Sequence, residues 1–505
     1  MKDDQYGQAP QTVSDRNGDA ERPPVKVLSL PALPLVIDLD GTLTNTDSFD
    51  ETFLDALRAN PLVLWKLPVI LSSGRAAMKA WLADISPLEV ETWPVRQDFL
   101  AFVQEEVAAG RRVVLATGAD QTIARAFAAR FPFIEQVVAS DGVRNLKGRE
   151  KAERLEALFP DGFIYAGDAA ADLVVWQDAS ASVVVHATKD VVERVRRLGE
   201  PLAVFDRAPI TFAMLRRSLR LHQWVKNFLV FLPLVLGGKA GDLQVWITAF
   251  MGFLALSFAA SATYLINDLW DLPSDRRHWS KRKRPLASGD LSVRRGIVLA
   301  VAGLAAGFGL ALTLGGLALA MLVAYVIVTL SYSFAWKRIP ILDVCILAGL
   351  FTLRLGIGIA LSGVVLSPWL LVFSMFVFLS LSIAKRHTEV LRLAERGLQS
   401  IHGRGYTAAD APLTLGIGLA ATLGAVLIMV LYLIEDAFPR GFYANPVWLW
   451  AMPPILFLFL SRVWLLSQRG QLHDDPVAFA LKDRVSLLLG GLMALSFAAA
   501  LVKIG

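Results

Sequence analysis

Long apolar runs fill residues 221–505, and they restrict the fold of this chain more than any other feature. A helix of about 20 apolar residues is long enough to cross the hydrocarbon core of a bilayer. Nine such runs can be placed, at 221–239, 244–266, 295–314, 316–336, 339–361, 366–384, 412–433, 446–466 and 485–503. With 55% hydrophobic residues overall, the chain is too apolar for a soluble protein, so we predict an all-α membrane domain over 221–505.

The charges of the loops predict an orientation. The loops after the second, fourth, sixth and eighth runs are rich in Lys and Arg, whereas the alternate loops are short or nearly uncharged. Basic loops belong in the cytosol by the positive-inside rule. An odd number of crossings then places everything before residue 221 in the cytosol and the C-terminus outside, in a bacterial inner (plasma) membrane.

The residues before 221 have a different composition. Residues 1–30 are polar, contain Pro and Gly, and predict a disordered cytosolic tail. We expect a soluble domain at 31–207 and a linker at 208–220. The single cysteine, Cys345, excludes an intrachain disulfide. The net charge of +5 is modest, and its placement matters more than its size. We expect the membrane as a partner and no nucleic acid; a homo-oligomer stays open.

The segment NDLWDLPSDRRHWSKRKRPLASG at 267–289 is the strongest candidate for a site in the membrane domain. Asn267, Asp268, Asp271 and Asp275 recur at helical spacings of three and four, which predicts that one face of a single helix carries three acids. Such acids repel one another unless a cation lies between them, and Mg²⁺ is a hard divalent ion that prefers oxygen ligands. Acids at the edge of a membrane are costly and usually mark a site.

This motif resembles that of the UbiA superfamily of intramembrane prenyltransferases. The resemblance implies nine helices, a Mg²⁺-dependent site that opens to the cytosol, and metal ligation by Asn267, Asp268, Asp271 and Asp275, with Asp268 and Asp271 as catalytic residues. The second acidic motif of the aromatic prenyltransferases, DxxxD, is absent from the loop after the sixth run, which reads KRHTEVLRLAE. This departure argues against simple prenyl-diphosphate chemistry.

Further motifs resemble the decaprenyl-phosphate phosphoribosyltransferase branch of that superfamily, over 216–503: RLHQWVKNFLVFLPL at 220–234, the basic run after the acids, SIAKRHTEVLRLAERG, and ALKDR at 480–484. The branch joins a polyprenyl phosphate to 5-phosphoribosyl diphosphate (PRPP). These two substrates carry several phosphates, which Lys and Arg can bind. The candidates are Lys226, Arg276, His278, Lys281, Arg284, Lys385 and Arg386, with Tyr332, Lys337 and Arg354 as weaker ones.

The soluble part contains a second set of motifs. LPLVIDLDGTLTNTDS at 33–48 is a buried strand followed by Asp38 and Asp40, at the strand end where open α/β sheets keep their sites. It resembles the first motif of the haloacid dehalogenase (HAD) superfamily. Three further pieces follow in the expected order: Thr117 in VVLATGAD, Lys147 or Lys151 in NLKGREKAERL, and Asp168 with Asp172 in FIYAGDAAADLVVW.

The resemblance implies an α/β (Rossmannoid) domain and assigns roles to these residues. Asp38 would be the nucleophile and Asp40 the general acid and base. Mg²⁺ would be held by Asp38, the backbone carbonyl of Asp40, and Asp168, with Asp172 nearby. Thr117 and one of the two lysines would bind the transferred phosphoryl group. Residues 48–110 are expected to form a helical cap whose apolar side is domain core rather than a lipid-contacting surface.

Three functions are compatible with these motifs. The favoured one is a bifunctional enzyme that transfers 5-phosphoribose from PRPP to a polyprenyl phosphate and then removes the 5-phosphate, for synthesis of a cell-envelope glycan donor. The alternative is a UbiA-type prenyltransferase that uses a prenyl diphosphate and an aromatic acceptor, with a structural or unrelated HAD domain. The third is a non-catalytic membrane scaffold or transporter.

Overall fold

The computed structural model describes residues 33–502 apart from Leu88, Ile210, Arg396, 398–403, 473–478 and Leu481. The tail predicted at 1–30 lies outside the described residues. The chain divides into two compact units, and each is described by itself. The first consists of Met1–Leu43, Gly74–Ala80 and Val95–Ala208; the second consists of Thr44–Ser73, Trp81–Pro94 and Pro209–Gly505.

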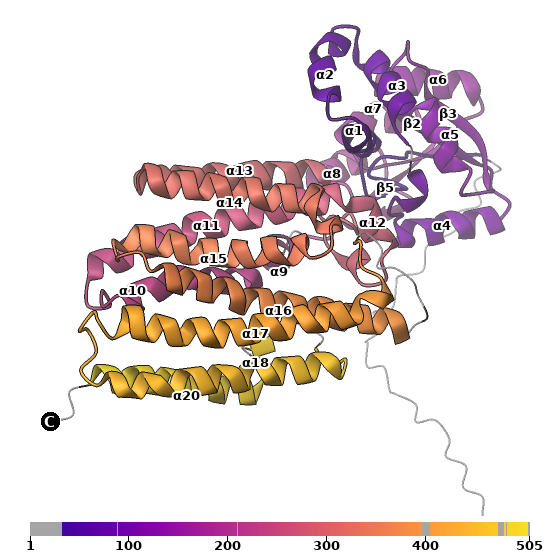
Figure 1. Cartoon of the computed structure of the whole chain (residues 1–505). Helices are drawn as coiled ribbons and strands as arrows, with labels where there is room; N and C mark the ends of the chain where they lie inside the picture. The colour runs from indigo at the N-terminus through magenta and orange to yellow at the C-terminus, as the bar shows by residue number, and fades with distance from the viewer. Residues whose placement is uncertain are drawn as a thin grey trace, which may run out of the picture. The chain divides into compact units, whose positions relative to one another are not determined.

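The first unit is built on a parallel sheet of six strands in the order β3-β2-β1-β4-β5-β6 (Figure 1). The strands are β1 (Leu35–Ile37), β2 (Val113–Asp120), β3 (Ile134–Ser140), β4 (Ile164–Gly167), β5 (Ala181–Val185) and β6 (Ala203–Phe205). The helices between them are α4 (Gln97–Ala108), α5 (Gln121–Ala128), α6 (Arg149–Leu158), α7 (Leu173–Asp178) and α8 (Lys189–Leu198). The central strands are continuous buried apolar runs, as is typical of a parallel sheet with both faces covered.

The strand order brings the predicted motif residues to one edge of the sheet. The chain runs outward from β1 through β2 to β3 and returns to β4 on the other side of β1, where Val36 pairs with Tyr165. Ligand sites of open α/β sheets lie at such a reversal, beyond the carboxyl ends of the strands. Asp38 follows β1 and Asp168 follows β4. The predicted α/β fold of this domain is confirmed.

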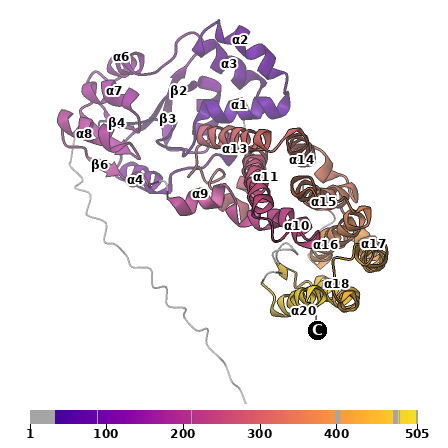
Figure 2. The same cartoon turned by 90° about the vertical axis from the view of Figure 1, so that its left-hand side faces the viewer.

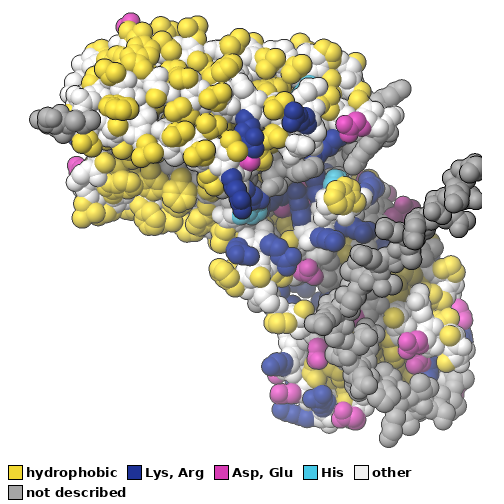
Figure 3. All heavy atoms as spheres, turned by 90° about the horizontal axis from the view of Figure 1, so that it is seen from below, with side chains coloured by type: hydrophobic (Ala, Val, Ile, Leu, Met, Phe, Trp, Pro, Cys, Tyr) yellow, Lys and Arg dark blue, Asp and Glu magenta, His cyan; other side chains and the backbone are white. Residues whose placement is uncertain are grey.

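The second unit is a helical bundle (Figure 2). Its long helices are α11 (Leu243–Trp270), α13 (Val293–Thr313), α14 (Gly316–Phe334), α15 (Leu342–Ser362), α16 (Pro368–Glu395), α17 (Ala411–Tyr432), α18 (Met452–Gln468) and α20 (Arg484–Leu501). Among the described residues, 8 helical segments are long and apolar enough to cross a membrane. Hydrophobic side chains cover the flank of the bundle, and Lys and Arg side chains lie toward one of its ends (Figure 3). The predicted membrane domain is confirmed.

The predicted count of nine spans is not confirmed. The run expected at 221–239 forms a 3₁₀ helix, Leu221–Phe231, that continues into the short helix α10 (Leu232–Leu236). Together they are shorter in sequence than any of the 8 segments that are long enough to cross a membrane. A short helix, α9 (Phe212–Ser218), precedes them.

Small residues let α11 and α13 pack closely. A Cβ atom added to Gly307 of α13 would lie 2.8 Å from the carbonyl oxygen of Ala255 and 3.4 Å from the Cβ of Ala259, both on α11. Small residues are common at the interfaces of membrane helices because they allow backbones to approach. This packing fixes α11, whose last turn carries the start of the acidic motif.

The insert, which we define as residues 44–73 and 81–94, belongs to the second unit by its contacts. It contains α1 (Ser48–Ala59), α2 (Val63–Leu71) and the last residues of α3 (Arg75–Ile85). The expectation that its apolar side is domain core is wrong for α2, because Leu64, Trp65 and Val69 are 50%, 83% and 71% exposed. Helix α2 packs against α1 with one face only, and this contact leaves its other large apolar side chains uncovered.

Candidate active sites

A buried acidic centre lies at the carboxyl ends of β1 and β4. Ligand oxygens of Asp38, Asp168 and Asp172 all lie within 4.8 Å of one another. The Nζ of Lys151, in the first turn of α6, donates hydrogen bonds to Oδ1 of Asp38 and to the hydroxyl of Tyr165, each at 2.9 Å. The Tyr165 hydroxyl donates in turn to Oδ1 of Asp172 at 2.8 Å. One lysine and one tyrosine thus hold two of the three carboxylates.

The structure distinguishes the two candidate lysines by position. The side chain of Lys151 is buried and contacts Asp38, whereas Lys147 is exposed. Thr117 is completely buried in β2, and its Oγ1 accepts a hydrogen bond from the backbone N–H of Ala119 at 3.1 Å. Asp40 is partly exposed beside this centre.

The charges of this centre favour a bound cation. Burial raises the pKa of Asp38 to about 6, although the Lys151 ammonium opposes the shift. Burial, together with the charges of Asp38 and Asp172, raises the pKa of Asp168 well above its usual range. Gly41 has a positive φ of 75°, and any Cβ there would collide with the Asp168 carboxylate. Three carboxylates, those of Asp38 and Asp172 buried and that of Asp168 partly buried, with one ammonium have the donor set and the excess negative charge that suit Mg²⁺.

The acidic motif of the second unit does not lie on one continuous helix, so that prediction is corrected. α11 ends at Trp270 and α12 (Leu272–Arg277) begins after Asp271. Pro273 has no N–H and cannot bond the carbonyl of Leu269, four residues earlier. The guanidinium of Arg58, from α1 of the insert, donates to that carbonyl instead at 2.9 Å.

Each acid of the motif is paired with basic side chains. Asp268 accepts hydrogen bonds from Arg220 and, at 3.0 Å, from Nη1 of Arg284. The same Nη1 atom also binds Asp275. Asp268 and Asp275 therefore converge on one guanidinium nitrogen.

Asp271 is held separately, because the Nζ of Lys337 lies 2.9 and 2.8 Å from its two carboxylate oxygens. Lys281 lies 3.7 Å from Asp275. Across the part of the chain that the structure describes, Asp268, Asp271 and Asp275 do not form an acidic group as close as the one around Asp38. Asn267 is partly exposed on the last turn of α11.

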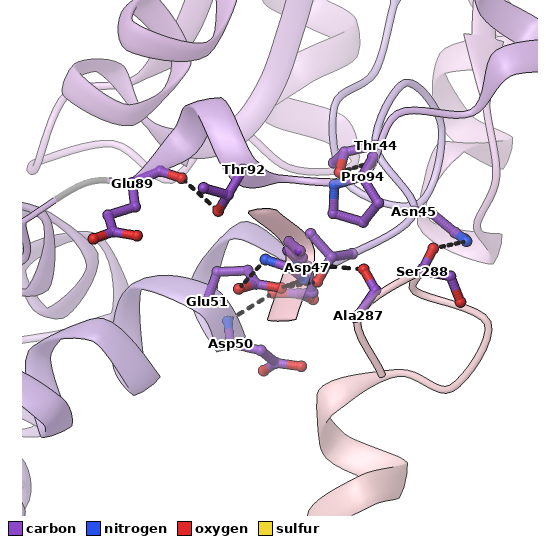
Figure 4. A network of polar contacts seen from close by, with 12 residues as sticks. Thr44, Asn45, Asp47, Asp50, Glu51, Glu89, Thr92, Pro94, Ala287 and Ser288 are labelled. Carbon is purple, nitrogen blue, oxygen red and sulfur yellow. Dashed lines mark hydrogen bonds and ion pairs between the residues drawn. The ribbon is translucent and has the colours of Figure 1, made fainter. Parts of the chain in front are cut away.

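The insert holds the loop after the motif in place. Both terminal nitrogens of Arg276 bind the carboxylate of Glu51, at 3.0 and 2.6 Å, and the side chains are only 5% and 2% exposed. Asn45 donates to the carbonyl of Ser288 at 3.1 Å, with Asp47, Asp50 and Glu51 nearby on the start of α1 (Figure 4). Arg276 is thus occupied by a carboxylate, where the sequence predicted a phosphate ligand.

The remaining phosphate-binding candidates lie in several environments. Arg386 is 1% exposed and forms ion pairs with Asp343, at 3.0 Å, and with Glu389. Lys385 and His278 are partly exposed. Lys226 lies over the ring of Phe351, with its Nζ 5.5 Å from the ring centre.

Arg354 is buried and donates to Asn227, to the carbonyl of Leu350 and to Tyr325. Its hydrogen bonds are thus made within the core of the bundle. This pairing removes the main reason for regarding an intramembrane Arg as a substrate ligand.

Arg220 is a site residue that the sequence reasoning did not select. It adopts a left-handed backbone conformation with φ 50°, binds Asp268, and stacks on the ring of Tyr264 with its guanidinium carbon 4.8 Å from the ring centre. Arg220 opens the RLHQWVK motif, and this was the signal that could have identified it. Glu51 was missed because its partner lies 225 residues away.

Comparison with known proteins finds a family match over each of the two parts of the chain. The HAD (haloacid dehalogenase-like hydrolase) family model matches residues 35–175, which contain the buried acidic centre. Uncharacterized protein y4nM of Sinorhizobium fredii is 41% identical over 484 residues, covering 94% of this chain and 93% of its own. Nodulation protein NoeC of Azorhizobium caulinodans is 32% identical over 299 residues, covering 57% of this chain and 94% of its own.

Two further matches each cover slightly more than half of this chain. The decaprenyl-phosphate phosphoribosyltransferase of Mycobacterium tuberculosis is 32% identical over 283 residues, covering 54% of this chain and 89% of its own. The model of the UbiA prenyltransferase family matches residues 228–495, more than half of the chain and the part that contains the acidic motif. The chain therefore carries an HAD-like domain in its first half and, as a whole, belongs to the UbiA prenyltransferase family.

Proposed function

We propose that this protein transfers 5-phosphoribose from PRPP to a polyprenyl phosphate and then removes the 5-phosphate of the product. The observation that carries the transferase half is the alternation of acids and bases around the motif, in which Asp268 and Asp275 share Arg284 and Asp271 binds Lys337. The related decaprenyl-phosphate phosphoribosyltransferase supports the choice of substrates. The donor and acceptor bring several phosphates to one place, which requires more positive groups than a single diphosphate does.

The bases of the motif would bind and orient the substrates. Arg220, Arg284, Lys281 and Lys337 would exchange their carboxylate partners for phosphate oxygens of the donor and acceptor. Asp268 and Asp275, which already converge on one nitrogen, are the carboxylates best placed to hold Mg²⁺, with Asp271 and Asn267 as further predicted ligands. When bound, Mg²⁺ would stabilise the leaving diphosphate. An oxygen of the acceptor phosphate then forms a bond to C1 of ribose as the bond from C1 to the diphosphate breaks.

The acidic centre of the HAD-like domain would carry out the second reaction. A carboxylate oxygen of Asp38 bonds to the phosphorus of the 5-phosphate while Asp40 protonates the departing ribose oxygen. Asp40 then removes a proton from the water that releases phosphate from Asp38. Lys151 orients Asp38, and Thr117 is the predicted ligand of the phosphoryl group. Asp38, Asp168 and Asp172 would hold Mg²⁺, which would neutralise the phosphoryl charge.

The orientation predicted from the loop charges would place both reactions on the side of the membrane where their soluble substrate is available. Both sites would lie on the cytosolic side of a bacterial inner membrane, where PRPP is made, and the polyprenyl tail would lie against the apolar helices. The basic side chains gathered toward one end of the bundle support this proposal (Figure 3).

Mass spectrometry of the lipid product tests both reactions. The protein is supplied with PRPP, polyprenyl phosphate and Mg²⁺, and compared with Asp38→Asn and Arg220→Lys. We expect polyprenyl-phosphoryl ribose from the unaltered protein and the 5-phosphorylated lipid from Asp38→Asn. Arg220→Lys should slow ribosylation by about 10- to 150-fold, since a hydrogen bond to a charged group contributes about 1.5–3 kcal/mol. Arg282→Lys, an exposed position of the basic run, is the control.

The outcomes separate the two activities. If the unaltered protein also stops at the 5-phosphorylated lipid, the transferase proposal stands and the phosphatase proposal fails. If no ribosylated lipid forms and a label from prenyl diphosphate appears on an aromatic acceptor, the alternative prenyltransferase replaces our proposal.

A further inference from the structure

Helix α2 of the insert exposes a concentration of large apolar side chains. Between residues 62 and 71 the exposed ones are Leu62 (61%), Leu64 (50%), Trp65 (83%), Val69 (71%) and Leu71 (54%). Among the described residues of the first unit, only Val143 and Leu198 are large, apolar and exposed, and they lie far apart in sequence. Single exposed apolar residues need no explanation, but a contiguous patch usually marks an interaction surface.

The contacts of α1 determine where α2 begins. At the start of α1, Asp50 of the first turn and Asp47, the N-cap residue, accept hydrogen bonds from Arg294 at 2.8 and 3.0 Å. Arg294 is the second residue of the membrane-crossing helix α13. In the last turn, Arg58 donates to the carbonyl of Leu269, one residue before the end of the crossing helix α11. Both ends of α1 are therefore tied to the ends of crossing helices on the same side of the bundle.

The lipid-facing surface of α13 begins next to this anchor. Ile297, Val298 and Val301 are 37%, 65% and 61% exposed in the segment assigned as a membrane crossing. Ile297 lies three residues after Arg294, a rise of about 4.5 Å along a helix. α1 is thus fixed within about one helical turn of the level at which α13 starts to face lipid, and α2 follows α1 after only three residues.

We infer that α2 lies in the bilayer interface, with its apolar side chains at the boundary between lipid head groups and acyl chains. Trp65 suits this depth because Trp is enriched where one end of a side chain is apolar and the other is wet. The neighbouring Lys66 is exposed and can extend its ammonium group to the lipid phosphates. The partner that covers the exposed face of α2 is lipid, and this lipid is continuous with the lipid around α13.

Site-specific fluorescence on the full-length protein tests the inference. Cys345 is the single cysteine, so a Cys345→Ala background allows one NBD label at a time. The label is placed through Trp65→Cys or Val69→Cys, in nanodiscs with or without lipids that carry a nitroxide near the head group. Val298→Cys on α13 is the positive control. Val143→Cys, 87% exposed in the first unit, is the negative control.

We expect the emission at positions 65 and 69 to shift to the blue relative to position 143 and to be quenched by the nitroxide lipids, as at position 298. Emission at both positions that matches position 143 in wavelength and lacks quenching would overturn the inference. A blue shift without quenching would also overturn it, because the helix would then be covered by protein, such as a second copy of the chain. Unchanged migration in size-exclusion chromatography checks that each variant is folded.

Discussion

Lys151 is the residue on which the acidic centre of the HAD-like domain depends. Its ammonium group lies 2.9 Å from Asp38 and 3.6 Å from Asp172, and its side chain is only 4% exposed. Burial opposes the charged form of Lys151, but the charges of Asp38 and Asp172 raise its pKa. Lys151 therefore stays protonated and favours the ionised form of the proposed nucleophile.

At limiting Mg²⁺, the proposed phosphatase rate should fall on the acidic side of pH 6. Burial raises the pKa of Asp38 to about 6, so that lowering the pH through this value protonates the group that must be ionised to attack phosphorus. Lys151→Met removes the opposing positive charge, raises the pKa of Asp38 further, and should move the acidic limb of the profile to higher pH. The measurement is kcat/KM against pH at limiting Mg²⁺, so that the metal-free site is titrated, with Lys147→Met as the control. Identical acidic limbs for the three proteins would refute this role.

At the scale of elements, a buried ion pair connects α12 to α1. Glu51 and Arg276 are both buried and bonded through two nitrogens and two oxygens. Arg277, the next residue, pairs with Glu89 at 3.0 Å, but its side chain is 60% exposed. These neighbouring ion pairs differ mainly in burial. Burial determines how much the free energy of unfolding falls when one partner is removed.

Glu51→Gln should destabilise the protein far more than Glu89→Gln. The first change leaves a buried guanidinium without its counter-charge, which costs about 3–5 kcal/mol. The second removes an exposed pair that contributes about 0–1 kcal/mol. Thermal unfolding of both variants in detergent measures the difference. Similar melting temperatures for the two variants would show that the Glu51 pair is not buried as described.

At the scale of the whole molecule, the short segment Leu221–Leu236 determines on which side the chain ends. Eleven residues of 3₁₀ helix and five of α-helix would extend roughly 30 Å at about 2.0 and 1.5 Å per residue, close to the thickness of the hydrocarbon core. α9 and α10, which flank the 3₁₀ helix, lie toward opposite ends of the bundle (Figure 1). A sixteen-residue segment can therefore cross.

Nine crossings predict that the C-terminus lies outside. Alkaline phosphatase fused after Leu501 should be active, because this enzyme folds only outside the cytosol, and green fluorescent protein at the same position should be dark. The reverse pattern would mean that Leu221–Leu236 does not cross. Fusions after Gly315, between α13 and α14, should report the same side as fusions after Leu501, because six crossing segments separate the two positions.

Local patterns in the sequence predicted the features that depend on neighbouring residues alone. The strand-end acids Asp38 and Asp168 and the apolar spans follow from spacing and run length, and the structure has the corresponding elements. The break at Pro273 could have been predicted from the missing N–H of proline, but the donor that replaces it, Arg58, comes from a distant part of the chain. The pairing of Arg220 with Asp268 and of Glu51 with Arg276 depends on tertiary contacts, which no local pattern encodes.

The membership of residues 44–73 and 81–94 in the second unit affects how the gene could be divided or recombined. A boundary drawn near residue 207 separates the two chemistries in sequence, yet it takes Glu51 and Arg58 away from the loop that they hold. A shortened gene that begins at the membrane domain would encode α12 without its buried counter-charge. Exchange of HAD-like domains between related genes would have to keep the insert with the membrane half, so the two parts of the gene are expected to be inherited together.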